Sequence, residues 1–249
     1  MAQYAFYFDQ SRCYSCQACS IACKDWNLQG PGPEKWMTVY DWEEGAFPKI
    51  RLHNLAFSCG HCENPVCLKA CPNGAIFKEE RYGAVLIDQA KCRGTRQCAV
   101  ACPYGAPKFA SDAAGAKMSK CTMCIDRLES GEAPVCVLSC PLRALDFGKL
   151  EDMIAKYGDL RRLEGMPDPS VTTPAYIVKP NDPKKELVPY DADKALELMG
   201  VRGDLGTVFE SAEDVRKIPE GTVKRSKSGF KMKHGSMEEM MQATRNDIG

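Results

Sequence analysis

The sequence predicts an α+β fold made of two similar small modules, with a hairpin inserted near the N-terminal end and a long extended arm at the C-terminal end. Three observations lead to this prediction. Fifteen cysteines recur in four groups between residues 13 and 140, and a recurring motif indicates repeated structural units. Short apolar runs separated by turn residues lie between the groups, which is typical of small strands. Prolines are frequent from about residue 166 onward, which favours extended chain over helix.

Local patterns predict the elements of the modules. Strands are expected at residues 4–9 (YAFYFD), 76–77, 84–88 (AVLID) and 144–147 (ALDF). The second and third of these strands flank Arg81-Tyr82-Gly83, so they are expected to form a hairpin. Residues 151–163 (EDMIAKYGDLRRL) predict a helix that breaks at Gly158.

Two segments lie outside the repeated motif. Residues 24–58 contain no cysteine and are interpreted as an insertion, with a turn at 30–33 (GPGP) and a hairpin within 36–57. Residues 151–249 form the predicted arm, which runs extended over the surface from about Met166. The last 30 residues or so are polar and weakly patterned, which predicts partial disorder. They hold a basic run, interpreted as a solvated tail, of Lys224, Arg225, Lys227, Lys231 and Lys233.

Composition excludes several classes of protein. The chain has 249 residues, with 33 Lys plus Arg against 33 Asp plus Glu, so the basic excess of a nucleic-acid-binding protein is missing. No apolar run reaches the roughly 20 residues that a membrane-spanning helix needs. The N-terminal residues lack the basic and apolar regions of an export signal. We therefore expect a cytoplasmic protein, or one that is exported or held at a membrane together with a partner.

The cysteine spacing is the most specific feature of the sequence. The first group is C-x2-C-x2-C-x3-C, the second is C-x2-C-x4-C-x3-C-P, the third has three cysteines before Pro103, and the fourth has four before Pro141. The groups comprise Cys13, Cys16, Cys19 and Cys23; Cys59, Cys62, Cys67 and Cys71; Cys92, Cys98 and Cys102; and Cys121, Cys124, Cys136 and Cys140.

These spacings predict iron–sulfur clusters. A cubane-type cluster has up to four iron corners, each bound by a thiolate, and cysteines at i, i+3 and i+6 can supply three of them, while the last cysteine of a run binds a second cluster. Zinc is the best alternative, but zinc sites use paired hooks that give two ligands each, whereas these groups are triplets plus a distant fourth. An odd cysteine count in a chain of this length also argues against a disulfide framework.

Four runs predict four clusters in two ferredoxin-like 2[4Fe–4S] modules, each with pseudo-twofold symmetry. Which runs pair is left open by the residues themselves. Spacing along the chain favours neighbours, the first run with the second and the third with the fourth, but it does not decide the matter.

The chain resembles the four-cluster iron–sulfur subunits of the DMSO reductase family of molybdopterin oxidoreductases. The resemblance covers about residues 3–181. It rests on the segments FDQSRCYSCQACSIACKD (8–25), SCGHCENPVCLKACPNGAI (58–76), CAVACPYGAPKF (98–109), KCTMC (120–124), PVCVLSCPLRALDFG (134–148) and TTPAYIVKPN (172–181). The last of these is similar to the arm that such subunits carry.

The resemblance implies nested pairing of the runs. It places residues 1–23 with 104–150 in one module and residues 59–103 in the other. The implied ligand sets are Cys13, Cys16, Cys19 and Cys140; Cys121, Cys124, Cys136 and Cys23; Cys59, Cys62, Cys67 and Cys102; and Cys92, Cys98 and Cys71. The family also implies a role as an electron-transfer subunit without catalysis of its own, between a quinone-reactive membrane subunit and a molybdopterin or tungstopterin catalytic subunit.

The third run departs from the family, because Thr95 stands where relatives have cysteine. A threonine hydroxyl resists deprotonation and is a poor iron ligand. The expected cofactors are therefore three [4Fe–4S] clusters and one [3Fe–4S] cluster, or a fourth [4Fe–4S] cluster with an atypical ligand. Two alternative functions are a free-standing ferredoxin carrier and a zinc-stabilised binding scaffold. The insertion and the arm argue against a carrier, because a diffusing carrier needs neither. Metal analysis distinguishes a scaffold, which would contain zinc, from an iron–sulfur protein.

Several other residues lie beside the motifs. His61 lies between two cysteines and is expected to pack rather than to bind iron, and Tyr104 is expected to exclude water from a cluster. Lys24, Arg93 and Arg96 are adjacent to ligands, with solvated surface charge as the simpler interpretation. Trp26, Trp36 and Trp42 in the insertion are expected in the core or at a subunit contact.

Overall fold

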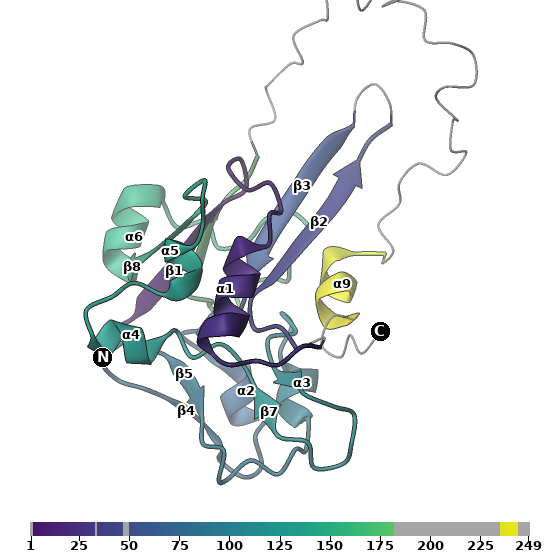
Figure 1. Ribbon diagram of the computed structural model, residues 1–249, viewed down its shortest axis with the longest axis vertical. Coiled ribbons are helices and arrows are strands. Elements are labelled where there is room, and N and C mark those ends of the chain that lie inside the picture. The colour runs from purple at the N-terminus through teal and green to yellow at the C-terminus, as the bar shows by residue number, and fades with distance from the viewer. Residues whose placement is uncertain (1, 33, 47–49, 182–234, 244–249) are drawn as a thin grey trace, which may run out of the picture. The chain divides into compact units, whose positions relative to one another are not determined.

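The first strand of the chain organises the largest sheet. In a computed structural model that describes residues 2–32, 34–46, 50–181 and 235–243, β1 (Tyr4–Asp9) lies between β8 (Leu145–Lys149) and β9 (Tyr176–Lys179) (Figure 1). It pairs with β8 in antiparallel and with β9 in parallel orientation. All described residues belong to one compact unit.

Both faces of β1 are buried, which explains its continuous apolar sequence. Phe6 and Phe8 point to the core that also contains the cysteines, whereas Ala5 and Tyr7 pack against α6 (Leu150–Tyr157). Tyr7 stacks on Tyr157 of that helix, with ring centroids 3.6 Å apart. The sheet thus separates α6 from the cysteine-bearing loops.

The segment after the first cysteine group forms a two-stranded ribbon. β2 (Thr38–Glu44) pairs with β3 (Arg51–Phe57) in antiparallel orientation, as expected for the predicted hairpin. The base of the ribbon is buried at Tyr40 and Leu55, while Leu52 near its tip is exposed. Figure 1 shows the ribbon projecting away from the rest of the described unit.

Short helices lie within or directly beside the cysteine groups, and they contain Cys19, Cys23, Cys67, Cys98 and Cys136. They are α1 (Ala18–Trp26), α2 (Val66–Lys69), α3 (Gln97–Ala101), α4 (Ile125–Glu129) and α5 (Val135–Leu138). Helix α1 packs against α5, and α2 packs against α3. The helix of the first cysteine group therefore meets that of the fourth, and the helix of the second group meets that of the third.

Most predicted local elements are present. Strand β1 has the predicted bounds, β4 (Ile76–Lys78) pairs with β5 (Val85–Ile87), and α6 ends at Gly158, whose φ is +84°. One short pair was not predicted, β6 (Lys108–Phe109) with β7 (Met118–Ser119). None of the helices in the described ranges is long and apolar enough to cross a membrane.

The prediction of an arm over the surface is wrong for residues 174–178, which are buried. Tyr176 and Ile177 are fully buried, and β9 is an edge strand of the central sheet. The prolines suggested an exposed segment, but the apolar run between Pro174 and Pro180 pairs with β1 and enters the core. Residues 182–234 of the predicted arm, including the basic run at 224–233, and residues 244–249 lie outside the described residues.

One helix occurs where partial disorder was predicted. Helix α9 (Met237–Ala243) buries Met237, Met240 and Met241 against the main core. Gln242 donates hydrogen bonds to the carbonyl oxygens of Cys102 and Pro103, at 2.8 and 2.7 Å. Three methionines on one face explain the helix, because residues three and four apart share a helical face.

Candidate iron–sulfur sites

All fifteen cysteines are free thiols, and they surround four cavities. We name each cavity by one of its cysteines. The Cys13 cavity is lined by Cys13, Cys16, Cys19 and Cys140; the Cys23 cavity by Cys23, Cys121, Cys124 and Cys136; the Cys59 cavity by Cys59, Cys62, Cys67 and Cys102; and the Cys92 cavity by Cys71, Cys92 and Cys98. No cysteine is left over.

The cavities are alike in size. The space that the lining residues surround, which includes part of the open solvent at each mouth, is about 350 Å³ at Cys13, 290 Å³ at Cys23, 380 Å³ at Cys59 and 300 Å³ at Cys92. Within the described ranges, no three thiol, imidazole or carboxylate groups lie close enough to hold a single metal ion; the thiols of each group instead stand around a larger space. Four thiols around such a space match the donor set of a cubane cluster, with one thiolate for each iron corner.

The Cys13 cavity joins the two ends of the cysteine-bearing region. Cys19 and Cys23 lie one turn apart in α1 and are both buried, so that Cys19 faces the Cys13 cavity and Cys23 faces the next one. Ser15 and Gln17 have φ values of +58° and +62°, a left-handed backbone that curls the loop between the cysteines. Cys16 is exposed, so this cavity approaches the surface.

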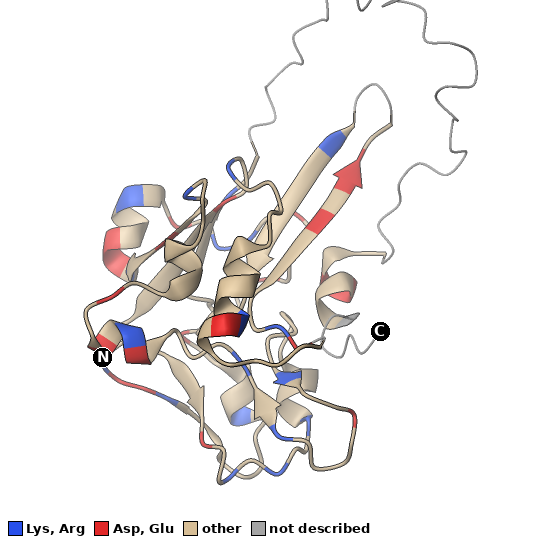
Figure 2. Ribbon diagram, in the orientation of Figure 1, with Lys and Arg blue, Asp and Glu red and all other residues tan. Residues whose placement is uncertain are grey.

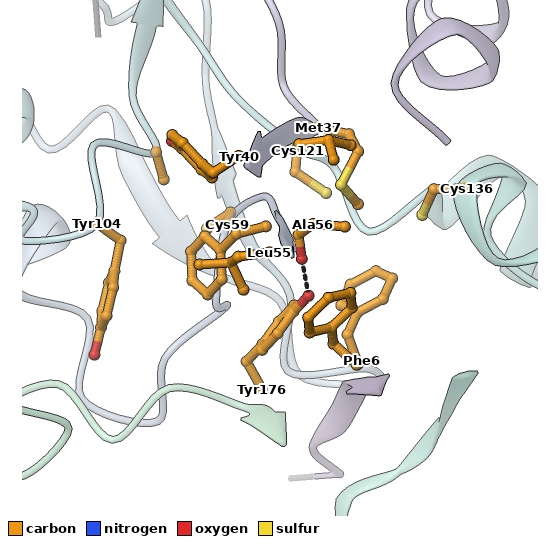
Figure 3. Close-up of a cluster of buried hydrophobic side chains, with 14 of the residues drawn as sticks. Phe6, Met37, Tyr40, Leu55, Ala56, Cys59, Tyr104, Cys121, Cys136 and Tyr176 are labelled. Carbon is orange, nitrogen blue, oxygen red and sulfur yellow. Dashed lines mark hydrogen bonds between the residues drawn. The ribbon is translucent and has the colours of Figure 1, made fainter. Parts of the chain in front are cut away.

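The Cys23 cavity lies beside the aromatic core. Phe6, Trp36 and Met37 line it together with the four cysteines. Figure 3 shows Cys121 and Cys136 near Phe6 and Tyr176, whose hydroxyl donates a hydrogen bond to the carbonyl of Ala56. These side chains keep water away from the thiols.

The Cys59 cavity is closed by the segment before β9. Thr172 and Tyr104 line it, and their hydroxyl oxygens are 2.9 Å apart. The backbone of residues 60–64 pairs with that of 172–175: Ala175 donates to the carbonyl of Gly60 at 2.8 Å, and Glu63 donates to that of Thr173 at 2.8 Å. This contact explains why Thr172, Pro174 and Ala175 are buried.

The Cys92 cavity has three thiols and a threonine. Thr95 lines it together with Gly94, Arg93 and Arg96. Arg96 lies 4.4 Å from the ring centroid of Phe109 and forms an ion pair with Asp112 at 3.3 Å. Thr95 thus lies at the wall where the other cavities have a fourth cysteine.

Burial and mutual proximity raise the pKa of many of these thiols. Burial is the largest cause, and thiols of the same cavity add to it, which brings the pKa of Cys19, Cys67 and Cys121 to about 12 and that of Cys98 to about 11. These four thiols are therefore harder to deprotonate than a free thiol. A metal centre that binds thiolates would relieve this crowding, because its positive charge stabilises the deprotonated form.

The cavities form a succession of neighbours. The pKa of Cys136 in the Cys23 cavity is raised first by burial, then by the thiols of its own cavity, and also by Cys19 of the Cys13 cavity. Likewise Cys59 raises the pKa of Cys121, and Cys98 raises that of Cys67. The order is therefore Cys13, Cys23, Cys59 and Cys92.

Backbone amides are directed at the sulfur atoms. The amide of Ala144 donates a hydrogen bond to Cys140 Sγ at 3.2 Å, the amide of Ala75 donates to Cys71 Sγ at 3.3 Å, and the amide of Met118 donates to Cys92 Sγ at 3.5 Å. Such donors stabilise negative charge on sulfur, and hydrogen bonds to the sulfurs are one of the factors that set a cluster's reduction potential.

The other predicted residues have varied positions. His61 is fully buried and accepts the Val85 N–H on Nδ1 at 3.0 Å, and burial lowers its pKa well below the usual value, in agreement with a packing role. Lys24 donates to the carbonyls of Gly32 and Glu34, at 2.8 and 3.1 Å. Trp36 lines the Cys23 cavity, whereas Trp26 is half exposed and donates to Asp126 at 2.7 Å.

Among the wall residues that the sequence did not single out are Lys120 and Thr172, both of which line the Cys59 cavity. Lys120 directly precedes the Cys121–Cys124 hook, and this adjacency was the available signal. Thr172 lies 101 residues after Cys71 in numbering, and no local pattern connects it with the second group.

Comparison with known proteins agrees with this geometry. Residues 50–150 match the 4Fe-4S dicluster domain family. The sequence is 42% identical over 187 residues to the B chain of anaerobic dimethyl sulfoxide reductase from Escherichia coli, covering 72% of this protein and 89% of the relative. It is 39% identical to the B subunit of sulfite dehydrogenase from Allochromatium vinosum (61% and 71% covered) and 36% identical to the thiosulfate reductase electron transfer subunit PhsB of Salmonella typhi (60% and 78% covered).

Proposed function

Because the chain belongs to the family of anaerobic dimethyl sulfoxide reductase B chains, we propose that it relays electrons through iron–sulfur clusters to or from a molybdopterin- or tungstopterin-containing catalytic subunit. The observation that carries this proposal is the succession of four thiol-lined cavities. A relay needs redox centres that are each next to another, and the thiols of consecutive cavities act on one another.

The proposed ligands follow the cavities. Three of the sets combine three cysteines of one run with one cysteine of its nested partner run, and the fourth combines two cysteines of the third run with one of the second, which gives two ferredoxin-like modules. The sets are Cys13, Cys16, Cys19 and Cys140; Cys121, Cys124, Cys136 and Cys23; Cys59, Cys62, Cys67 and Cys102; and Cys92, Cys98 and Cys71, with Thr95 at the open corner. The packing of α1 on α5 and of α2 on α3 supports the same pairing.

The protein's own part in the relay is to hold and insulate the centres. An iron–sulfur cluster supplies one-electron chemistry when bound. The thiols fix its position, the amides of Ala144, Ala75 and Met118 stabilise charge on sulfur, and Tyr104 and Phe6 exclude water from the cavity walls.

At the Cys92 cavity we propose a three-iron cluster, because only three thiols line it. Replacing Thr95 with Cys should supply a ligand for the fourth corner. The expected result is loss of the three-iron spin signal from oxidised protein and a gain of about one iron per chain. A wild-type protein with four intact four-iron clusters would overturn this assignment, and Thr95→Ser provides a matched control that keeps the hydroxyl.

The catalytic partner is proposed to dock near the Cys13 cavity. The exposed side chains of Tyr14 and Leu142 line it, and the exposed side chains of Ile21 and Leu138 lie on α1 and α5. Figure 2 shows no charged residue on α5 and charge only at one end of α1. An exposed apolar surface with little charge is typical of the centre of a protein interface. A quinone-reactive membrane subunit is the proposed partner at the other end of the relay.

The proposal is tested with the chain purified together with its catalytic subunit. Analysis should find about 15 irons with matching acid-labile sulfide, and reductant added to the complex should reduce the clusters within the catalytic turnover time. Zinc in place of iron, or clusters that are reduced but never exchange electrons with the catalytic subunit, would refute it.

A further inference from the structure

Lys120 is a buried cation between two of the cavities. Its exposed fraction is 3%, and it follows β7 directly. Its side chain lines the Cys59 cavity, and the next residue, Cys121, lines the Cys23 cavity. The lysine therefore stands where the relay passes from one proposed module to the other.

The ammonium has hydrogen-bond partners but no carboxylate in the part of the chain that the structure describes. Its Nζ donates to the carbonyl of Val85 and, at 3.1 Å, to that of Cys121. An ammonium group has three donors, so one remains for a further acceptor. A buried charge without a counter-charge is strongly destabilising, so a negative group is expected close by.

The neighbouring side chains do not supply that negative charge. The imidazole of His61, which accepts the Val85 N–H on Nδ1 at 3.0 Å, is either neutral or cationic, so it offers no negative charge. The groups that remain are those of the two cavities that meet at Lys120: the lysine lines the Cys59 cavity, and the adjacent Cys121 lines the Cys23 cavity.

We propose that Lys120 is a fixed positive charge whose counter-charges are the anionic thiolate-bound groups of the Cys23 and Cys59 cavities, and that it makes one-electron reduction of these two centres more favourable. This inference rests on the proposed function. Reduction adds one electron, and thus one negative charge, to a centre; no proton or bond is exchanged with the lysine. A nearby cation stabilises the more negative, reduced form by Coulomb attraction.

Three substitutions separate charge from packing. Lys120→Met keeps the length of the side chain without charge or donors, Lys120→Gln keeps a donor without charge, and Lys120→Arg keeps the charge. Lys156→Met is the matched control, because Lys156 is exposed and paired with Asp146 at 2.9 Å on the far side of the sheet.

The measurement is a potentiometric titration of the purified complex, followed by the spin signals of the clusters. At a fixed potential, Lys120→Met and Lys120→Gln should lower the ratio of reduced to oxidised centre about tenfold for two clusters, which corresponds to about 59 mV for a one-electron couple. In these two variants, the potentials of the other two clusters should stay near the wild-type values. In Lys120→Arg and Lys156→Met, the potentials of all four clusters should stay near the wild-type values.

The alternative outcomes are distinct. Unchanged potentials in Lys120→Met and Lys120→Gln, or equal shifts of all four clusters, would overturn the role of Lys120 while leaving the relay in place. If both uncharged variants lose two clusters and Lys120→Arg retains them, the charge is required for assembly, which supports the proposed ion pairing. Absence of iron and sulfide from the wild-type protein would instead refute the proposed function.

Discussion

Gly94 tests how the Cys92 cavity is built. Its φ is +67°, and a Cβ at this position would lie 2.5 Å from the carbonyl oxygen of Ala116 and 2.6 and 2.8 Å from the backbone C and Cα of Gly115. These are backbone atoms, which cannot rotate away as a side chain does. Gly94→Ala should therefore push apart the loop that carries Thr95 and the loop at 115–116.

The magnitude has two parts. A non-glycine residue in the left-handed region costs about 1–2 kcal/mol, and insertion of a methyl group into packed backbone costs about 1–3 kcal/mol more. Gly74 provides the control, because its φ is +57° and a methyl group added there would have nothing within 4 Å of it. Gly74→Ala should show the first cost alone, so the two variants should differ by about 1–3 kcal/mol.

Denaturant unfolding of the purified chain measures that difference, and the spin signal of the cluster in the Cys92 cavity shows where it acts. We expect Gly94→Ala to reduce the occupancy of this cluster while the other three are retained. Equal stability and equal cluster content in Gly94→Ala and Gly74→Ala would refute the close packing of the two loops.

Two further predictions concern the sheet and the docking surface. The Asp9 carboxylate is buried, lies 3.1 Å from the Lys179 ammonium and accepts a hydrogen bond from Ser11; burial raises its pKa, but these contacts outweigh burial and lower the pKa below 3.8. Asp9→Asn should therefore lower the free energy of unfolding by about 1–3 kcal/mol at pH 7, and this difference from wild type should vanish as the pH falls through the depressed pKa. Unfolding at several pH values measures the difference, and a difference that stays constant with pH would contradict the prediction. The double variant Ile21→Ser/Leu138→Ser should weaken binding of the catalytic subunit at least tenfold, about 1.4 kcal/mol, with unchanged iron content. The control Phe77→Ser, at another exposed apolar residue, should bind as wild type does. If the double variant binds as tightly as the control, this surface is not the docking site.

The local elements of this fold could be predicted because their signals are local. The apolar run at 4–9, the turn at 81–83 and the glycine at 158 each act within a few residues, and the structure has the strand, the hairpin and the helix end that they indicate. The cysteine spacing likewise indicated the chemistry of the sites. Ligation by particular cysteines stays a prediction, supported by the four cavities.

The pairing of the runs could not be derived from spacing, because it depends on contacts between distant segments. Neighbouring runs are favoured by chain entropy, yet α1 meets α5 and α2 meets α3. The reason lies in the sheet: β1 precedes the first run and pairs with β8, which follows the fourth. That pairing brings the two outer runs together and leaves the inner two to each other.

The segment 172–179 connects two parts of the proposed relay. Through β9 it is bonded to β1 beside the first run, and through residues 172–175 it is bonded to the loop of the second run. One short stretch thus ties the Cys23 side of the fold to the Cys59 side, at the step where Lys120 also lies. Electron-transfer rates fall steeply with distance, so a fixed spacing at this step matters more than extra stability. The prolines at 174 and 180 suit that purpose, because they restrict the backbone on both sides of the strand.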